Sequence, residues 1–286
     1  MLSAEHISKY LHSTWAGQRI VYMDVTGSTN NDAGSLAQNG APGGTLVVAD
    51  RQDSGRGSRG RSWSTPSGSN IAMSIIVRPD APPAKVPMLT LVMGLSVAEG
   101  VDLSISEMAL GDRGRDCFIK WPNDIVIGGR KICGILTELH MNPDNTISDV
   151  VIGVGINVTM VDFPDEIKNT AGSVLSQTGV RVDRSLVVAR CMERFEENYG
   201  KYEETYDLSL LREQYEDRLL NKGERVKILD PGGEFEATAY GITDGGSLVI
   251  KPVNELPSGS SFACNKDGVI EINAGEVSVR GLYGYV

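Results

Sequence analysis

The feature that most constrains this fold is a change of residue pattern near Asn221. Before it, apolar strands are interspersed with long helical patterns. These helices are expected at about 88–101, 184–206 and 208–220. After it, about five short strands fall within roughly 65 residues, separated by turns such as Asp244-Gly245-Gly246. Such spacing predicts a small β-barrel. We therefore expect two domains, residues 1–221 and residues 222–286.

The first domain is expected to contain one mixed sheet. Its strands are expected at about 19–25, 45–49, 70–77, 118–121, 125–127, 131–139 and 150–158. Gly128-Gly129 is typical of a hairpin turn between two of them. Short helices are expected at 3–14 and from Ser28 to near Gly40. Helices around a largely hairpin-linked sheet indicate an α+β fold rather than strict β-α-β alternation.

Charge, cysteines and hydropathy exclude several classes of protein. The formal net charge is −10, which lacks the basic character of a nucleic-acid binder. The four cysteines form no CxxC motif and the three histidines no HExxH motif, so the pattern favours reduced thiols in the cytoplasm over a zinc site. The N-terminus does not resemble a signal peptide, and we expect no apolar run of the ~18 residues that a membrane span needs.

Glycine is unusually frequent, with 33 among 286 residues against a typical value of about 7%. Three of these glycines lie in Ser54–Trp63 (SGRGSRGRSW), with Arg56, Arg59 and Arg61. Glycines let backbone amides approach an anion, and arginines donate to phosphate or carboxylate groups. Trp63 is suited to stacking on a flat ring. A mobile, solvated surface loop is the alternative interpretation.

A second segment, Lys120–Leu136, carries further polar residues (KWPNDIVIGGRKICGIL). Asn123 and Asp124 offer an amide and a carboxylate for a magnesium-bound nucleotide. Lys131 lies in an otherwise apolar strand, where a lysine is costly unless it points into a polar site. The alternative is a gatekeeper lysine on an edge strand. Gly134 suggests a ligand lying against the strand.

A third segment, GVGIN, places two glycines inside an apolar strand. Gly153 and Gly155 weaken that strand, so either a bound molecule approaches them closely or the strand carries a bulge. Asn157 at its end offers a polar contact to the same molecule. Together the three segments predict one pocket, in which a nucleotide and a second, anionic substrate condense.

These motifs, in this order, resemble the biotin protein ligases. GRGSRGRSW, KWPND, GRKICGIL and GVGINV match the pattern of that family, and Ser28-Thr29-Asn30 and Gln52 match two of its earlier elements. The resemblance covers about residues 20–160 and extends more weakly to Gly275–Gly281 (GEVSVRG). It implies a class II aminoacyl-tRNA synthetase-like catalytic domain with an SH3-like C-terminal barrel.

The resemblance also implies an activity. Biotin and ATP would form biotinyl-5′-AMP with Mg²⁺, and a lysine of a biotin carboxyl carrier domain, in a biotin-dependent carboxylase or decarboxylase, would then receive the biotin. The implied catalytic residue is Lys131, with Asp124 as the magnesium contact. The implied biotin contacts are Ser28, Thr29, Asn30, Gln52, Gly55, Arg56, Gly57, Lys131, Gly134, Gly153 and Gly155. The implied adenylate contacts are Arg56, Arg59, Arg61, Trp63, Asn123, Asp124, Lys131 and Asn157. A homodimer is implied as well.

The sequence departs from the family pattern at one position. Ser58 stands where the family usually has an arginine that helps to retain the adenylate. We expect either a weaker grip on the intermediate or compensation by Arg59. Because Ser28 lies close to the start of the chain, we also expect no DNA-binding domain before it.

Two other functions remain open from the sequence. A lipoate or octanoate ligase resembles this family in fold and uses a related lysine, although the arginine–glycine segment and KWPND favour biotin. A non-catalytic biotin-binding protein is the second alternative, and the presence of Lys131 argues against it.

Overall fold

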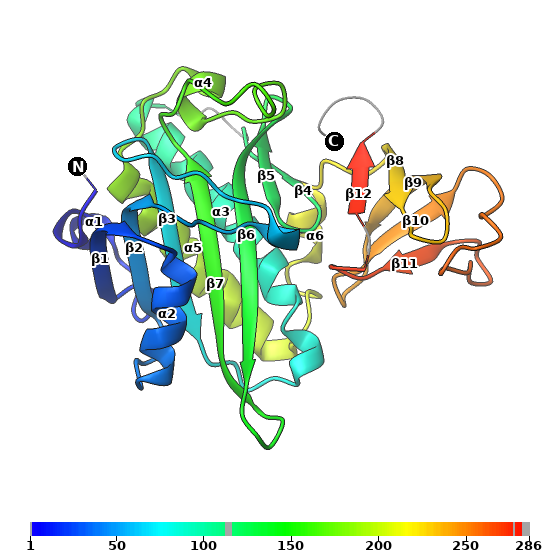
Figure 1. Cartoon of the computed structure of the whole chain (residues 1–286), viewed down its shortest axis with the longest axis horizontal. Coiled ribbons are helices and arrows are strands. Elements are labelled where there is room, and N and C mark those ends of the chain that lie inside the picture. Colours follow the sequence, from blue (N-terminus) through cyan, green and yellow to red (C-terminus); the bar gives the residue numbers. More distant parts are fainter. Residues whose placement is uncertain (1, 112–115, 277, 282–286) are drawn as a thin grey trace.

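A seven-stranded sheet forms the centre of the computed structural model, which describes residues 2–111, 116–276 and 278–281. Its strand order is β1-β2-β3-β7-β6-β5-β4 (Figure 1). The strands are β1 (Arg19–Thr26), β2 (Thr45–Gln52), β3 (Asn70–Val77), β4 (Phe118–Lys120), β5 (Asp124–Ile127), β6 (Arg130–Met141) and β7 (Ile147–Asn157). β1 and β2 are parallel, and the other neighbouring pairs are antiparallel. The mixed sheet is therefore confirmed.

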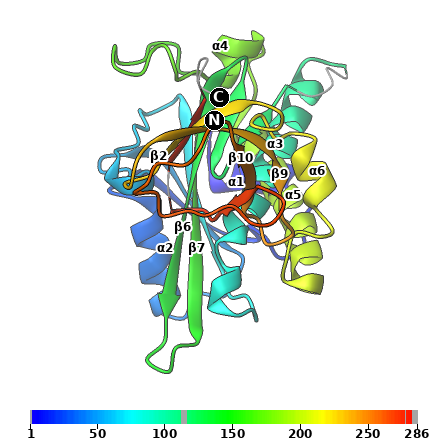
Figure 2. The same cartoon turned by 90° about the vertical axis from the view of Figure 1, so that its right-hand side faces the viewer.

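Helices cover both faces of this sheet (Figure 2). α2 (Thr29–Gln38) packs on β2, β3 and β7. α3 (Met88–Met108) and α5 (Arg184–Thr205) pack against each other on the opposite face. The short helix α1 (Ala4–Tyr10) packs on α5, and the short helix α4 (Val174–Thr178) contacts β5. Because strands β2 and β3 are covered on both sides, residues 45–49 of β2 and all of β3 are buried, and most of them are apolar.

The apolar helix α3 belongs to the core of the molecule. Together with the turn before it, Pro83–Met108 is long and apolar enough to cross a membrane, so our expectation that no such run exists was wrong. However, 83% of its most apolar stretch is buried within the molecule. A Cβ atom added at Gly100 would lie 2.6 Å from the backbone nitrogen of Cys191 in α5. The hydropathy of α3 thus reflects close packing between the sheet and α5.

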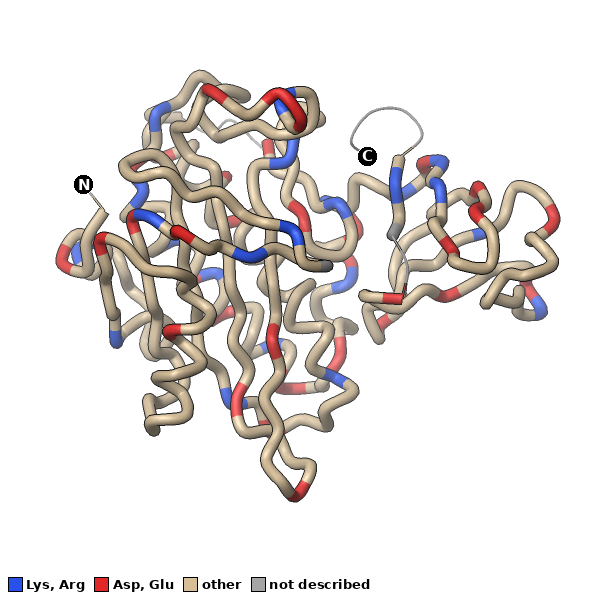
Figure 3. Tube along the Cα trace, in the orientation of Figure 1, with Lys and Arg blue, Asp and Glu red and all other residues tan. Residues whose placement is uncertain are grey.

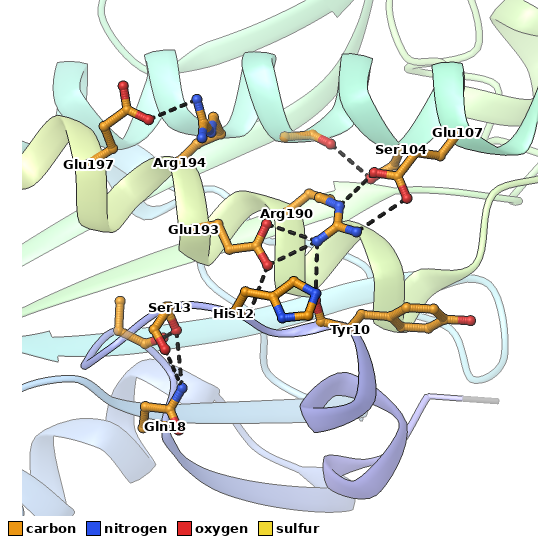
Figure 4. A network of polar contacts seen from close by, with 12 residues as sticks. Tyr10, His12, Ser13, Gln18, Ser104, Glu107, Arg190, Glu193, Arg194 and Glu197 are labelled. Carbon is orange, nitrogen blue, oxygen red and sulfur yellow. Dashed lines mark hydrogen bonds and ion pairs between the residues drawn. The ribbon is translucent and has the colours of Figure 1, made fainter. Parts of the chain in front are cut away.

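Side chains of α5 hold the N-terminal segment. Glu196 accepts hydrogen bonds from the backbone amides of residues 14–16 at 2.7 to 2.9 Å. Arg190 donates to the carbonyl of Tyr10 at 3.1 Å and pairs with Glu107 of α3 at 2.6 Å (Figure 4). Because these side chains satisfy the backbone after Tyr10, α1 ends there and does not continue to residue 14 as expected.

A second sheet contains all five short strands expected after Asn221. They are β8 (Arg225–Leu229), β9 (Phe235–Ile242), β10 (Leu248–Pro252), β11 (Ile270–Ile272) and β12 (Ser278–Gly281). Their order is β11-β10-β9-β8-β12, and all four neighbouring pairs are antiparallel. Figure 1 shows this sheet at one end of the molecule, beside β4 and β5.

The link between α5 and the second sheet, residues 206–224, is only partly helical. α6 spans Arg212–Glu216, so the helix expected at 208–220 was too long. The backbone amide of Ile119 in β4 donates to the carbonyl of Arg218 at 2.7 Å, and its carbonyl accepts from the amide of Leu220 at 2.9 Å. The link thus forms a single parallel bridge to β4, because its backbone finds partners on the sheet in place of a further helical turn.

Trp121, directly after β4, contacts both the link and the second sheet. Its backbone amide donates to Asn221 Oδ1 at 2.8 Å. Its indole nitrogen donates to the carbonyl of Gly246 at 3.0 Å. Asn221 is completely buried. The position of the segment after β4 is therefore set by residues on both sides of the domain junction.

Candidate active site

A narrow slot opens over β6 and β7 at the start of α2. Figure 1 shows the segment after β2 crossing in front of β3, β7 and β6, and Arg56, Gly57, Ser58 and Trp63 of this segment line the slot. The lining residues are Ser28, Thr29, Asn30, Gln52, Arg56, Gly57, Ser58, Trp63, Asn123, Lys131, Gly134, Ile135, Leu136, Gly153, Val154 and Gly155. The structure thus brings the three motif segments into one pocket, together with the Ser28-Thr29-Asn30 element.

Polar side chains at one end of the slot form a single network. Gln52 Oε1 accepts from the Thr29 amide at 2.9 Å. Ser74 Oγ lies 2.7 Å from Thr29 Oγ1 and 2.6 Å from Asn30 Oδ1. Asn30 Nδ2 donates to Glu138 Oε2 at 2.6 Å. Because Thr29, Asn30 and Ser74 are buried, this network presents fixed donors and acceptors to a small polar ring.

The arginine–glycine segment is a small hairpin that stays solvated, since Arg56, Gly60 and Arg61 are exposed. The Trp63 amide donates to the Gly55 carbonyl at 2.8 Å, and the Gly57 amide donates to the Arg61 carbonyl at 2.7 Å. A 3-10 turn at Ser58–Gly60 forms its tip. A Cβ atom at Gly55 would overlap the Trp63 carbonyl. Glycine at this position is therefore required by the close approach of the two arms.

The glycines of β7 lie under side chains of the slot. A Cβ atom at Gly153 would overlap Asn30 Oδ1, and one at Gly155 would overlap the Trp63 indole. β7 pairs with both neighbours without a register shift at either glycine, so a bulge is not their cause. The indole nitrogen of Trp63 is buried and has no hydrogen-bond partner within the described chain. The glycines thus make room for the indole and the amide that form the slot.

Lys131 lies where the slot meets its surroundings. Its Nζ is 2.5 Å from Asp124 Oδ1 and 5.4 Å from the centroid of the Trp63 ring. A Cβ atom at Gly134 would lie 3.2 Å from this nitrogen, so Gly134 leaves space for the ammonium group. β6 is an interior strand of the sheet. The alternative of an edge-strand gatekeeper was therefore wrong.

Two further cavities adjoin the slot. One is largely apolar and is lined by Trp63, Lys131, Asn157, Phe163 and Ile167, among others. The other is a wide groove at the junction with the second sheet, whose lining includes Asp124 and Arg280. Lys131 lines both the slot and the apolar cavity, so its side chain lies at the boundary between them.

Lys120 is a site residue that our sequence analysis did not single out. It is 9% exposed and lines the groove. Burial is the main cause that lowers the pKa of Lys120 to about 8, and Lys131, Arg280 and Arg61 lower the pKa further against the opposing effect of Asp124. Figure 3 shows Lys and Arg residues on both the crossing segment and β12. This concentration of cations in an acidic chain suits a polyphosphate.

Several other predicted contacts have additional structural roles. Asn123 Nδ2 donates to the Ile135 carbonyl at 3.0 Å, and Asn157 Nδ2 donates to the Gly172 carbonyl at 3.0 Å. These amides hold the walls of the slot and of the apolar cavity. The side chain of Arg59 lies outside the described part of the chain, so its predicted compensation for Ser58 remains a prediction.

Glu138 is the second residue that our sequence analysis missed. Its Oε1 lies 3.0 Å from Arg56 Nη2. Gly134, Leu136 and Glu138 share one face of β6, because alternate residues of a strand point the same way. This spacing from Gly134 is the sequence signal that would have placed Glu138 beside the slot.

Known proteins share these features over most of the chain. Residues 22–157 match the Biotin/lipoate A/B protein ligase family, and residues 223–280 match the Biotin protein ligase C terminal domain. The bifunctional ligase/repressor BirA of Bacillus subtilis is 39% identical over 252 residues, which are 87% of this chain and 74% of that protein. The biotin--[acetyl-CoA-carboxylase] ligase of Mycobacterium tuberculosis is 33% identical over 241 residues, with 82% and 85% coverage.

A solved structure is similar to this one over most of its length. The biotin protein ligase of Aquifex aeolicus, in complex with biotin and ATP, superposes with a TM-score of 0.71 at 28% identity. The match covers 92% of this chain and 99% of that one. The slot, its lysine and its covering hairpin therefore lie in a chain that belongs to the biotin protein ligase family.

Proposed function

We propose that the slot holds biotin and that the two adjoining cavities hold ATP, in a protein ligase that forms biotinyl-5′-AMP and transfers biotin to a carrier protein. The observation that carries this arrangement is the position of Lys131, which lines the slot and the apolar cavity together. One ammonium group can therefore contact the biotin carboxylate and the α-phosphate at once.

In the first step, a carboxylate oxygen of biotin attacks the α-phosphorus of ATP and pyrophosphate leaves. Lys131 stabilises negative charge on both reactants, while Asp124 holds its ammonium group at 2.5 Å. Lys120, Arg61 and Arg280 line the groove, where they would bind the departing phosphates. Catalysis then consists of positioning and charge stabilisation by preorganised groups.

In the second step, the amine of a carrier lysine attacks the acyl carbon and AMP leaves. Lys131 stabilises the oxyanion that forms at this carbon. The hairpin Ser54–Trp63 covers the slot, so it would shield the mixed anhydride from water. Trp63 forms one wall against Gly155 and would contact the chain of biotin, with Arg59 and Arg61 contacting the adenylate from the same hairpin.

The polar network of the slot favours biotin over lipoate. Thr29, Asn30 and Gln52 offer several fixed hydrogen-bonding groups, with Ser28 beside them in the lining. The ureido ring of biotin has one acceptor and two donors to satisfy them, whereas the dithiolane ring of lipoate has none. A buried polar site that lacks its partner loses affinity for the wrong ligand.

Mg²⁺ would enter with the nucleotide. The described residues contain no group of three or more His, Cys, Asp or Glu side chains that could form a metal cage. Mg²⁺ is typically held by substrate phosphates with one or two carboxylates. Asp124 lines the groove and offers such a carboxylate, so the residues fit a metal whose chemistry is to neutralise charge on the phosphates.

The carrier domain of acetyl-CoA carboxylase is the first partner to test, since the Mycobacterium tuberculosis relative is named for it. We also propose a cytoplasmic homodimer, with a domain boundary between residues 221 and 222.

A labelling reaction tests the proposed function. The protein is mixed with Mg-ATP, biotin and a carrier domain, and the carrier is probed with streptavidin. We expect labelling by the wild type, no labelling by Lys131→Ala, and normal labelling by Lys201→Ala, a matched surface lysine that pairs with Glu197 on α5. Absence of wild-type labelling, or transfer of lipoate in place of biotin, would contradict the proposal.

A further inference from the structure

Glu138 joins two parts of the slot through one carboxylate. Its Oε2 accepts from Asn30 Nδ2 at 2.6 Å, in the first turn of α2. Its Oε1 lies 3.0 Å from Arg56 Nη2, on the covering hairpin. The side chain is 29% exposed, so solvent only partly screens these contacts. Glu138 thus touches two of the proposed biotin contacts without lining the slot itself.

The carboxylate of Glu138 fixes the orientation of the Asn30 amide. An ionised carboxylate can only accept hydrogen bonds, so the NH₂ group of Asn30 must face it. The oxygen of Asn30 then faces Ser74 Oγ at 2.6 Å. Ser74 is completely buried, and Asn30 Oδ1 can only accept, so this short contact needs the single hydroxyl proton of Ser74. That proton therefore goes to Asn30 Oδ1.

The same reasoning extends to Thr29. Ser74 Oγ lies 2.7 Å from Thr29 Oγ1, which is shorter than the 3.1 Å between Thr29 Oγ1 and Gln52 Oε1. Because the proton of Ser74 is already donated to Asn30, the short contact requires the proton of Thr29 to point at Ser74. The free lone pairs of Thr29 Oγ1 are then available to accept from an N–H group of a ligand.

Glu138 also places the hairpin. Arg56 is held by Glu138 and by Asn31 Oδ1, to which it donates at 2.7 Å. The Arg56 side chain is 47% exposed, and exposed ion pairs contribute little to stability. The contact therefore orients the hairpin and adds little to its stability.

We propose that Glu138 is a positioning residue that determines specificity for a ureido ring. It acts through Asn30, Ser74 and Thr29 by setting which of these groups accept hydrogen bonds, and through Arg56 by placing the hairpin. This inference rests on the proposed biotin site. A glutamine at this position presents either an oxygen or an NH₂ group, so the Asn30 amide loses its single orientation.

Calorimetric titration with biotin tests the inference. For Glu138→Gln we expect a Kd for biotin raised by roughly tenfold or more, the effect of one charge-assisted hydrogen bond. Desthiobiotin keeps the ureido ring but lacks the sulfur, so its Kd should rise by a similar factor. KM for ATP and the melting temperature should stay near wild-type values, and Glu138→Asp should recover part of the affinity.

Glu107→Gln is the matched control, because Glu107 also pairs with one arginine but lies far from the slot, at Arg190. Glu107→Gln should leave the Kd for biotin and the KM for ATP unchanged. Unchanged biotin affinity in Glu138→Gln, or an equal loss of affinity for biotin and ATP with a lower melting temperature, would overturn the positioning role. If the wild type itself bound no biotin, the proposed function would fail, and the inference with it.

Discussion

Replacing Gly155 with alanine should weaken biotin binding without unfolding the protein. The new Cβ atom would overlap the indole nitrogen of Trp63 and lie 2.9 Å from its Cδ1 atom. Overpacking of this kind costs about 1–3 kcal/mol. Trp63 belongs to the hairpin, which can shift away from β7 more easily than the sheet can deform. We therefore expect Gly155→Ala to keep its fold and to displace the Trp63 indole from the slot.

If this cost of about 1–3 kcal/mol is lost from binding, biotin affinity falls roughly 5- to 150-fold, at 1.4 kcal/mol for each factor of ten. Calorimetric titration measures that loss, and thermal unfolding shows whether the fold is intact. Gly100→Ala is the opposite case, since its Cβ atom would lie 2.6 Å from the backbone of Cys191. Two packed helices must then separate, so this variant should lose stability and keep its biotin affinity per folded molecule.

Gly200→Ala completes the comparison, because no heavy atom lies within 4 Å of the added Cβ atom in α5. Its melting temperature should rise slightly, since alanine favours a helix over glycine by about 1 kcal/mol. An unchanged Kd for biotin in Gly155→Ala would refute the reasoning. So would a loss of melting temperature as large as that of Gly100→Ala.

Four further outcomes follow from the same geometry. Ser58 lines all three cavities, so Ser58→Arg should slow release of the adenylate, and an unchanged release rate would exclude this. The pKa of Lys120 is lowered to about 8; hence affinity for ATP should fall as the pH rises through about 8, and Lys120→Arg should remove the fall. The same lowered pKa makes folding more favourable as the pH rises from about 8 towards 10.5, which thermal unfolding measures against Lys120→Met. Asn221→Ala frees the Trp121 amide and should raise KM for ATP more than KM for biotin, whereas Asn198→Ala, buried between α3 and α5, should lower stability alone.

The sequence predicted those parts of the site that lie within short segments. Lys131 was identifiable because a charged side chain in an apolar strand needs a partner, and Gly153 and Gly155 because glycine weakens a strand. Lys120 and Glu138 were missed because their roles depend on neighbours from other segments. Lys120 lines the groove together with Arg280, which comes from the second sheet.

The predicted ends of some helices were wrong for a related reason. Residues 208–220 have a helical pattern, but 218–221 lie beside the unpaired edge of β4 and bond to it. Local pattern cannot reveal that alternative partner. The residues of α3 were apolar enough to suggest a membrane helix, and only their packing against α5 shows that they belong to the core.

The pairing of the link with β4 has a consequence for how the molecule unfolds. An exposed strand edge is a template for aggregation, and residues 218–221 protect this one with the protein's own backbone. The bond between Trp121 and the Gly246 carbonyl, by contrast, joins this region to the second sheet, so the second sheet cannot pull away without breaking it. Because Trp121 follows Lys120 directly, detachment of the second sheet would disturb the groove, while residues 218–221 would still cover the edge of β4.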